Sequence, residues 1–145
     1  MNHIILLKKY LFKSNNLLGN NIIVSEILTD FENKDKLGFI FPETFYKLIN
    51  QSFELTKKNK KYMKYLLKKL FSFNNIGNKL DYPAGNMFWA RIDAIYQIFE
   101  FNFLKKFDSE KGQTNDTIMH GIERIWLYIV KFNGFYYKKI FKSYI

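Results

Sequence analysis

The sequence predicts a helix-rich α/β fold, in which helices cover a small sheet. Three observations lead to this prediction. Apolar residues recur at helical spacing in several stretches, most clearly at 54–71 and 116–132. A short apolar run, LGFIFP at 37–42, is bounded by a turn and a proline, as buried strands often are. The chain has 145 residues, of which 48% are hydrophobic, and this suffices for the core of one domain.

Six stretches are expected to be helical from their apolar spacing and their end signals. The last is the most regular. It is expected to begin at Asn115 or Asp116 and to end at Gly134, which suits a C-terminal cap. Its apolar stripe consists of Ile118, Ile122, Ile125, Trp126 and Ile129. The expected helices cover residues 4–13, 22–31, 43–51, 54–71, 91–99 and 116–132.

The expected sheet has three strands, formed by about residues 37–42, 84–90 and 134–140. Polar, turn-rich segments at 73–79 and 105–115 are expected to be surface loops.

Composition excludes several classes of protein. High hydrophobicity with 19% aromatic residues is the opposite of what disordered chains show. The absence of cysteine excludes a disulfide scaffold, cysteine-ligated zinc and a cysteine nucleophile. The apolar runs are broken by Lys or Asn and fall short of the ~20 residues that a membrane-spanning helix needs.

The chain is strongly basic, with a formal charge of +10. Its 23 basic residues include only two arginines, Arg91 and Arg124. Nucleic-acid surfaces favour Arg, and a Lys-, Asn-, Ile- and Phe-rich composition is also the product of an AT-rich genome. We therefore expect no specific nucleic-acid partner.

The lysines of the helix expected at 54–71 all lie between Lys57 and Lys69. Three interpretations stay open. The helix can be a solvated one with a single core stripe, a peripheral contact with an anionic membrane, or a contact with phosphate groups.

The last helix carries a polar face opposite its apolar stripe. At about 100° per residue, this face brings together Asp116, His120, Glu123 and Arg124. These groups suit a general base with an orienting partner, or a site for phosphate or sugar hydroxyls. The alternative is a solvated face with internal ion pairs.

A second candidate segment is DYPAGNMFWAR, residues 81–91. It combines aromatic residues with one of the two arginines, and aromatic faces often hold sugars, although a packed core strand explains them equally well. His3 and His120 are the only histidines, and motifs for phosphate-binding loops, zinc proteases and serine hydrolases are absent from the sequence. We therefore expect no metal site.

Four segments carry a family resemblance. YPAGNMFWARIDAI (82–95), KGQTNDTIMHGIERIW (111–126), the Gly-aromatic ending at 134–137 and the upstream residues 16–43 resemble the rhamnan synthesis protein F family. The resemblance implies a glycosyltransferase-like protein of rhamnan or O-antigen-type surface polysaccharide synthesis in bacteria. It also implies a GT-A-like domain.

The same resemblance implies roles for individual residues. The catalytic candidates are Asp116, Glu123 and His120. The substrate-binding candidates are Arg91, Arg124, Trp89, Asn86, Gly85 and Gln113. The implied ligands are a nucleotide sugar, with or without a divalent metal, and a glycan acceptor. No cofactor is expected within this chain itself.

Two departures from the family pattern set further expectations. The family has an acidic residue followed by Gly where this chain has Asn115 and Asp116, which puts the base in doubt. The N-terminal nucleotide-binding half of the family pattern is missing. Residues 1–145 are therefore expected to form one incomplete GT-A-like domain, weakly active or inactive alone. Exposed apolar surface is then expected to favour self-association.

Residues 1–145 are expected to act in the cytoplasm, and a peripheral position at the cytoplasmic membrane face stays open. The alternative function is a non-enzymatic basic module that docks on a membrane or a partner. Convergence of the polar face of the last helix with Trp89 and Arg91 would favour the sugar site.

Overall fold

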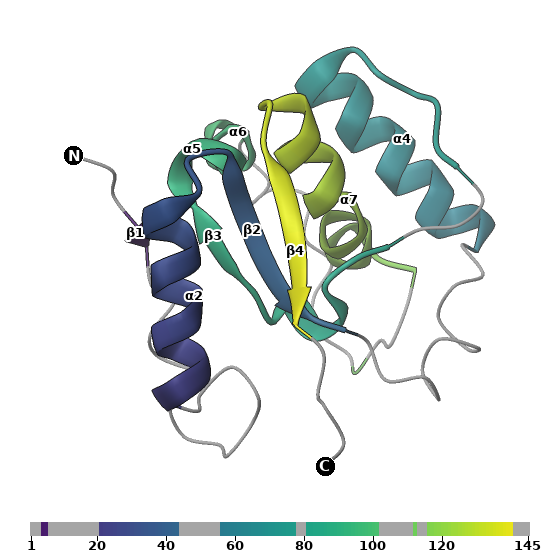
Figure 1. Ribbon diagram of the computed structural model, residues 1–145. Helices are drawn as coiled ribbons and strands as arrows, with labels where there is room; N and C mark the ends of the chain where they lie inside the picture. Colours follow the sequence, from purple (N-terminus) through teal and green to yellow (C-terminus); the bar gives the residue numbers. More distant parts are fainter. Residues whose placement is uncertain are drawn as a thin grey trace.

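The computed structural model describes residues 4–5, 21–43, 56–77, 81–101, 112 and 116–140. These residues form a small mixed sheet with helices on both faces, which confirms the α/β fold class (Figure 1). Its strands are β1 (Ile4–Ile5), β2 (Leu37–Pro42), β3 (Trp89–Arg91) and β4 (Tyr136–Ile140). Its helices are α2 (Asn21–Asn33), α4 (Lys57–Phe71), the 3-10 turn η1 (Ala84–Asn86), α5 (Ile92–Ile95), α6 (Gln97–Glu100) and α7 (Ile118–Phe132).

The sheet has the strand order β1-β3-β2-β4. β3 runs antiparallel to both β1 and β2, whereas β4 runs parallel to β2. The three expected strands are thus present. Ile4 and Ile5 were expected to be helical, and that prediction is wrong, because they pair with β3 at the edge of the sheet. The β-branched Ile4–Ile5 pair suits a strand better than a helix.

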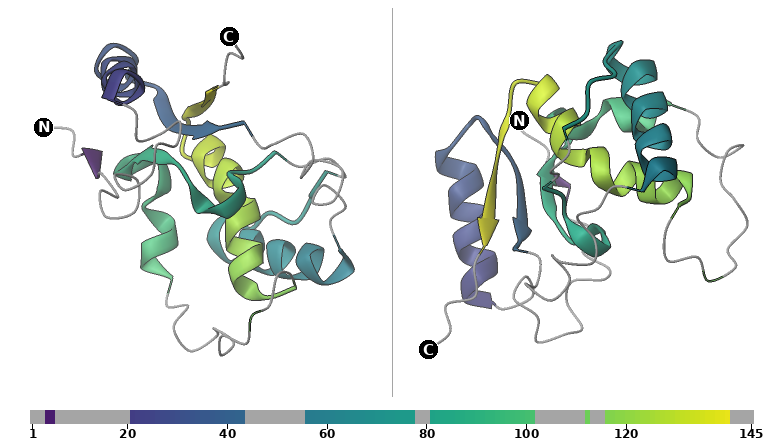
Figure 2. Two further views of the ribbon diagram at one scale, coloured as in Figure 1. Left: turned by 90° about the horizontal axis from the view of Figure 1, so that it is seen from below. Right: turned by 90° about the vertical axis from the view of Figure 1, so that its right-hand side faces the viewer.

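Two cores lie on opposite faces of the sheet. Figure 2 shows α2 on one face of the sheet and α7 on the other. The smaller core joins α2 to the sheet and consists of Ile27, Phe31, Leu37, Ile40 and Trp89. The larger core joins the other face to α7, and α4 packs against α7 as an outer layer. The close approach of α4 and α7 depends on Gly121, where a Cβ atom would lie 2.8 Å from the Cβ of Tyr62.

Two backbone turns differ from the expected boundaries. The strand expected from residue 84 begins only at Trp89, because Gly85 and Asn86 adopt left-handed conformations, with φ of 74° and 54°. The last helix begins at Ile118 and not at Asn115 or Asp116. Asp116 also has a positive φ, 65°, and Thr117 is the N-cap residue, whose hydroxyl accepts from the backbone N–H of His120.

The other expected elements fall partly outside the described residues. α2 and α4 confirm the helices expected at 22–31 and 54–71, and α5 with α6 replaces the helix expected at 91–99. Glu43 is not helical, since it continues from β2 and donates its N–H to Ile140. The remainder of 43–51, and 105–115 except Gly112, lie outside the described residues.

An ion-pair group ties α2 to β4 and makes the stability of the fold depend on pH. Asp30 in α2 accepts hydrogen bonds from Lys138 in β4 and from Lys34. Although partial burial opposes the shift, these lysines hold the pKa of Asp30 below its usual range. The pair therefore stabilises the fold above the unfolded-state pKa of about 4 and ceases to do so as pH falls through the lower folded-state value.

We expect Asp30→Asn to lower the melting temperature at pH 7, and to lower it less at pH 2, because the wild-type ion pairs weaken as pH falls through the lowered pKa of Asp30. Thermal unfolding of both proteins at the two pH values, followed by circular dichroism, measures this difference. The control is Asp35→Asn, because Asp35 is exposed in the following turn. A destabilisation by Asp30→Asn that is equal at both pH values would contradict the assignment.

Candidate functional site

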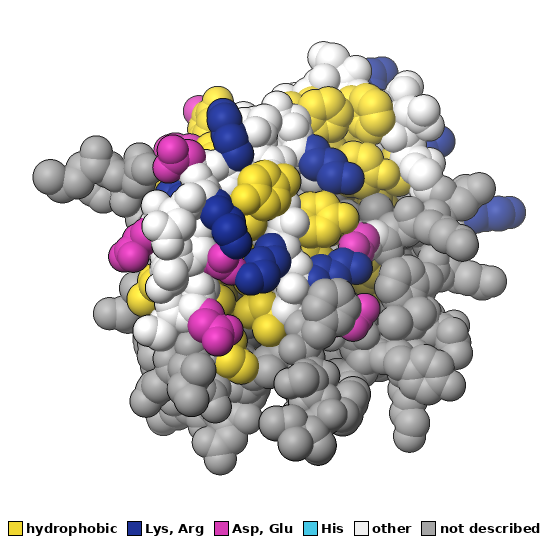
Figure 3. Space-filling view, viewed as in Figure 1, with side chains coloured by type: hydrophobic (Ala, Val, Ile, Leu, Met, Phe, Trp, Pro, Cys, Tyr) yellow, Lys and Arg dark blue, Asp and Glu magenta, His cyan; other side chains and the backbone are white. Residues whose placement is uncertain are grey.

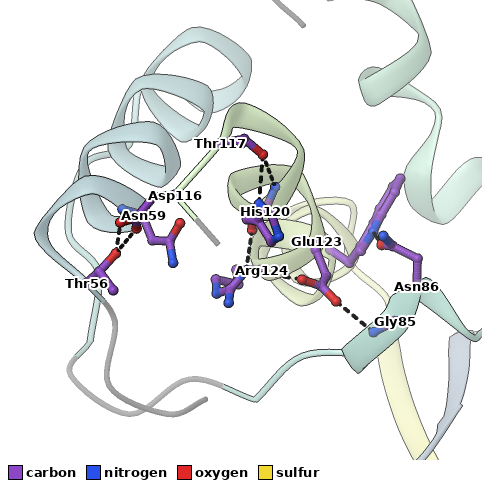
Figure 4. A network of polar contacts seen from close by, with 10 residues as sticks. Thr56, Asn59, Gly85, Asn86, Asp116, Thr117, His120, Glu123 and Arg124 are labelled. Carbon is purple, nitrogen blue, oxygen red and sulfur yellow. Dashed lines mark hydrogen bonds and ion pairs between the residues drawn. The ribbon is translucent and has the colours of Figure 1, made fainter. Parts of the chain in front are cut away.

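The candidate site forms where the N-terminal half of α7 meets the segment that leads into β3. α7 contributes His120, Glu123 and Arg124, and the segment contributes Gly85 and Asn86 (Figure 4). These two parts are more than 30 residues apart in the sequence. The structure thus brings together five of the residues that the sequence singled out.

Glu123 is the centre of this group. One carboxylate oxygen, Oε1, accepts a hydrogen bond of 2.7 Å from the backbone N–H of Gly85. The other, Oε2, lies 3.1 Å from Nη1 of Arg124. The left-handed conformation of Gly85 belongs to the η1 turn that presents this N–H to the carboxylate. Glu123 is 13% exposed, so its carboxylate lies at the edge of the protein interior.

Arg124 is buried beside Glu123 and is held on several sides. Its guanidinium carbon lies 4.9 Å from the centre of the Tyr82 ring, a cation–π contact. Nη1 also donates a 2.9 Å hydrogen bond to the backbone carbonyl of His120. Arg124 is not solvated, since its side chain is only 6% exposed, but its pairing with Glu123 is an internal ion pair of the kind that the alternative interpretation expected.

A second contact fixes the η1 turn against α7. The indole Nε1 of Trp126 donates a 2.8 Å hydrogen bond to the side-chain oxygen of Asn86. Gly85 and Asn86 are therefore both tied to α7, although each is exposed to solvent. This leaves the turn at the surface with a fixed conformation, which suits a contact with a ligand.

His120 and Asp116 lie toward the start of α7 (Figure 4). Nδ1 of His120 is 2.7 Å from the hydroxyl of Thr117, which orients the ring. The carboxylate of Asp116 accepts a hydrogen bond from the hydroxyl of Thr56, the N-cap residue of α4. In Figure 4, Asp116 and Thr56 lie on one side of His120, whereas Gly85 and Asn86 lie on the other.

The structure does not bring Arg91 and Trp89 into this group. The donors of Arg91 are directed at backbone carbonyls: Nε donates to Leu37, and Nη2 to Phe31 and Lys34 at the end of α2. Trp89 packs in the smaller core, on the α2 face of the sheet. Both side chains hold the fold together, and their convergence with the polar face of α7, which would have favoured the sugar site, is not observed. Gln113 lies outside the described residues.

Three contributors were missed by the sequence reasoning: Tyr82, Thr117 and Thr56. Tyr82 directly precedes the PAGN segment, but its partner is the distant Arg124 and not the nearby Arg91, so no local signal indicated the contact. Thr117 precedes the apolar stripe of the last helix, as capping threonines do. Thr56 carried no signal toward Asp116, because a contact across 60 residues depends on how α4 packs on α7.

This arrangement offers a carboxylate, an imidazole and an exposed polar turn within one region. Carboxylates and backbone amides are suited to sugar hydroxyls, and a carboxylate fixed by a guanidinium is suited to accept a proton at a defined position. Among the described residues, no group of three His, Asp or Glu side chains is placed to hold a metal ion.

A family model decides where this chain belongs. The model of rhamnan synthesis protein F matches residues 8–135, which is most of the chain. The chain belongs to the rhamnan synthesis protein F family. That match spans the η1 turn, the start of α7 and both cores. Membership associates the chain with the synthesis of cell-surface polysaccharide.

Two curated relatives share a shorter match with this member of the rhamnan synthesis protein F family. Both are named uncharacterized protein WxcX and come from two strains of Xanthomonas campestris pv. campestris, B100 and ATCC 33913. Each is 39% identical over 44 residues, which are 30% of this chain and 6% of the relative. The chain thus matches only a small part of their length. No solved structure matches the chain.

The helices that the structure describes are short or strongly charged. None of them is both long and apolar enough to cross a bilayer.

Proposed function

We propose that this chain forms part of a glycosyltransferase of rhamnan or O-antigen-type polysaccharide synthesis, and that the group around Glu123 is its acceptor site. One observation carries the proposal: the hydrogen bond between Gly85 and Glu123 joins the two segments that most resemble the family. Membership of the rhamnan synthesis protein F family supports the same proposal independently.

In this proposal Glu123 accepts the proton of the attacking sugar hydroxyl. The ion pair with Arg124 fixes the orientation of the carboxylate, so Arg124 is a positioning residue. Each carboxylate oxygen can accept two hydrogen bonds, so Glu123 can bind a hydroxyl in addition to its present partners. Gly85 and Asn86 line the same turn and bind the acceptor sugar.

His120 and Asp116 extend the proposed site along α7. The contact with Thr117 fixes one ring nitrogen of His120 and leaves Nε2 on the opposite side of the ring. We assign His120 to the substrate hydroxyls or phosphate. Asp116 is the second base candidate, and its bond with Thr56 places it at the junction of α4 and α7.

Calorimetric titration tests this function. The purified chain is titrated with nucleotide sugars, including nucleotide-activated rhamnose, and with rhamnose oligosaccharides, each with and without Mn²⁺ or Mg²⁺. We expect one of these ligands to bind and its affinity to fall at least about tenfold in His120→Ala. Asp35→Ala, in an exposed turn between α2 and β2, is expected to bind as the wild type does. A folded chain that binds no ligand of the panel would overturn the proposal.

A further inference from the structure

The outer surface of α4 carries a continuous row of lysines. Six of them are exposed, and we call this set the Lys face: Lys57, Lys58, Lys61, Lys64, Lys68 and Lys69. At about 100° per residue they cover an arc of roughly 140° on one side of the helix. They extend over about 18 Å of its length at 1.5 Å per residue. The helix contains no acidic residue.

The Lys face differs from the other basic surface of the protein. Near β4, Lys34 and Lys138 pair with Asp30, and Lys139 pairs with Asp81. Among the described residues, no salt bridge involves a member of the Lys face. In Figure 3, dark blue side chains project from the outline of the molecule over α4, whereas those over β4 lie beside acidic ones. The charge of the Lys face is therefore not balanced within the described fold.

The opposite side of α4 is already occupied. Asn59, Met63, Leu66 and Leu67 are fully buried, and the helix packs along α7. The helix therefore cannot lay its apolar side into a bilayer without leaving the core. A contact through the Lys face has to be electrostatic, with the helix resting on an anionic surface.

An aromatic cluster adjoins the C-terminal end of the Lys face. The rings of Phe71 and Phe132 stack at 4.5 Å, and Phe73 contacts Phe132 at 5.1 Å. Phe132 is 44% exposed although it is a large hydrophobic residue. Lysines beside an exposed aromatic ring are typical of surfaces that rest on lipid headgroups.

We propose that the Lys face binds the anionic headgroups of a lipid bilayer and holds the protein at the membrane surface. The charge complementarity is direct, since six unbalanced positive charges would meet a surface of negative headgroups. Contacts with the edges of nucleic-acid bases commonly use the planar guanidinium of Arg, and α4 contains no arginine. The inference goes beyond the proposed function and does not require it. The hydrogen bond between Thr56 and Asp116 joins α4, which carries the Lys face, to the candidate site.

Vesicle co-sedimentation tests the proposal. The full chain is mixed with vesicles of phosphatidylcholine alone, or with about a third of phosphatidylglycerol, at low and at physiological salt. We expect binding to the anionic vesicles only, and weaker binding as salt rises. Each basic residue near such a surface strengthens binding about fivefold, so Lys58→Gln/Lys61→Gln/Lys64→Gln should weaken it by about two orders of magnitude.

The matched control has the same net charge. Lys36→Gln/Lys131→Gln/Lys139→Gln removes three lysines outside α4, keeps both lysine partners of Asp30, and is expected to weaken binding much less. Equal losses in the two triple variants would mean that only net charge matters and would overturn the proposal. So would wild-type binding to neutral vesicles that equals binding to anionic ones. Duplex DNA that binds through the Lys face while anionic vesicles do not would assign the surface to nucleic acid instead.

Discussion

Replacing Arg91 with Met is expected to lower the free energy of unfolding by about 3–5 kcal/mol, because several buried carbonyl groups lose their donor together. For a chain of this length the melting temperature should fall by roughly 10 °C. Urea unfolding followed by circular dichroism measures the free energy, and a thermal scan measures the melting temperature.

The physical reason lies at the junction of α2, β2 and β3. Arg91 is only 6% exposed, and no described carboxylate pairs with it. Its guanidinium instead donates hydrogen bonds to the backbone carbonyls of Phe31, Lys34 and Leu37. It also lies over the Phe31 ring. A cation at the C-terminal end of α2 is also favourable for the helix dipole. Met fills similar space but donates no hydrogen bond.

Arg91→Lys is the informative companion variant. A lysine ammonium can reach fewer carbonyls than the planar guanidinium. The free energy of unfolding of Arg91→Lys is therefore expected to lie between those of Arg91→Met and the wild type. Lys131→Met, at an exposed position of α7, serves as the control for a lost positive charge. A Met variant as stable as the wild type would show that the carbonyls find other partners.

Replacing Glu123 with Gln is expected to abolish most sugar transfer by the glycosyltransferase of which the chain is proposed to form part. A general base contributes a factor of about 10²–10⁴, so we expect the transfer rate to fall at least ~100-fold. The acceptor KM should change little, because the amide oxygen of Gln can still accept from Gly85. The variant also leaves the buried Arg124 without its carboxylate, which should cost about 2–4 kcal/mol of stability.

Transfer of radiolabelled sugar to an acceptor, measured against acceptor concentration, separates the rate from KM. Glu26→Gln is the matched control, because Glu26 is an exposed glutamate of α2 on the opposite side of the sheet. Glu123→Ala should lose stability and also raise KM, since it releases Gly85. A Glu123→Gln variant that transfers at the wild-type rate would remove Glu123 as the base and leave Asp116 as the candidate.

The spacing of apolar residues predicted the helices and strands of this fold well where that spacing was regular. The apolar stripes of α4 and α7 and the LGFIFP run placed two helices and the central strand within a few residues. The errors arose where tertiary contacts override local preference. Ile4 and later apolar residues recur at helical spacing, but Ile4 and Ile5 form a strand because they pair with the edge of β3.

The candidate site was predictable only in part. The helical spacing of residues 116–124 is enough to place His120, Glu123 and Arg124 in one region. The hydrogen bond between Glu123 and Gly85 could not be predicted from helical spacing, because the two residues are 38 positions apart. Only the family resemblance linked the segments that contain them. Arg is scarce in this sequence, and this scarcity sets Arg91 and Arg124 apart. It could not show that Arg91 binds carbonyls of the fold rather than a substrate.

The η1 turn and the start of α7 are proposed to form one sugar-binding site. The two tryptophans of the chain test it directly, because Trp126 donates to Asn86 in the site while Trp89 lies in the core on the other face of the sheet. Each indole N–H gives one signal in a proton–nitrogen correlation spectrum, and the chain is titrated with the nucleotide sugar or oligosaccharide that binds. We predict that the Trp126 signal and the Gly85 amide shift together while the Trp89 signal stays in place. Binding that leaves Trp126 and Gly85 unmoved, or that shifts only Trp89, would contradict the site.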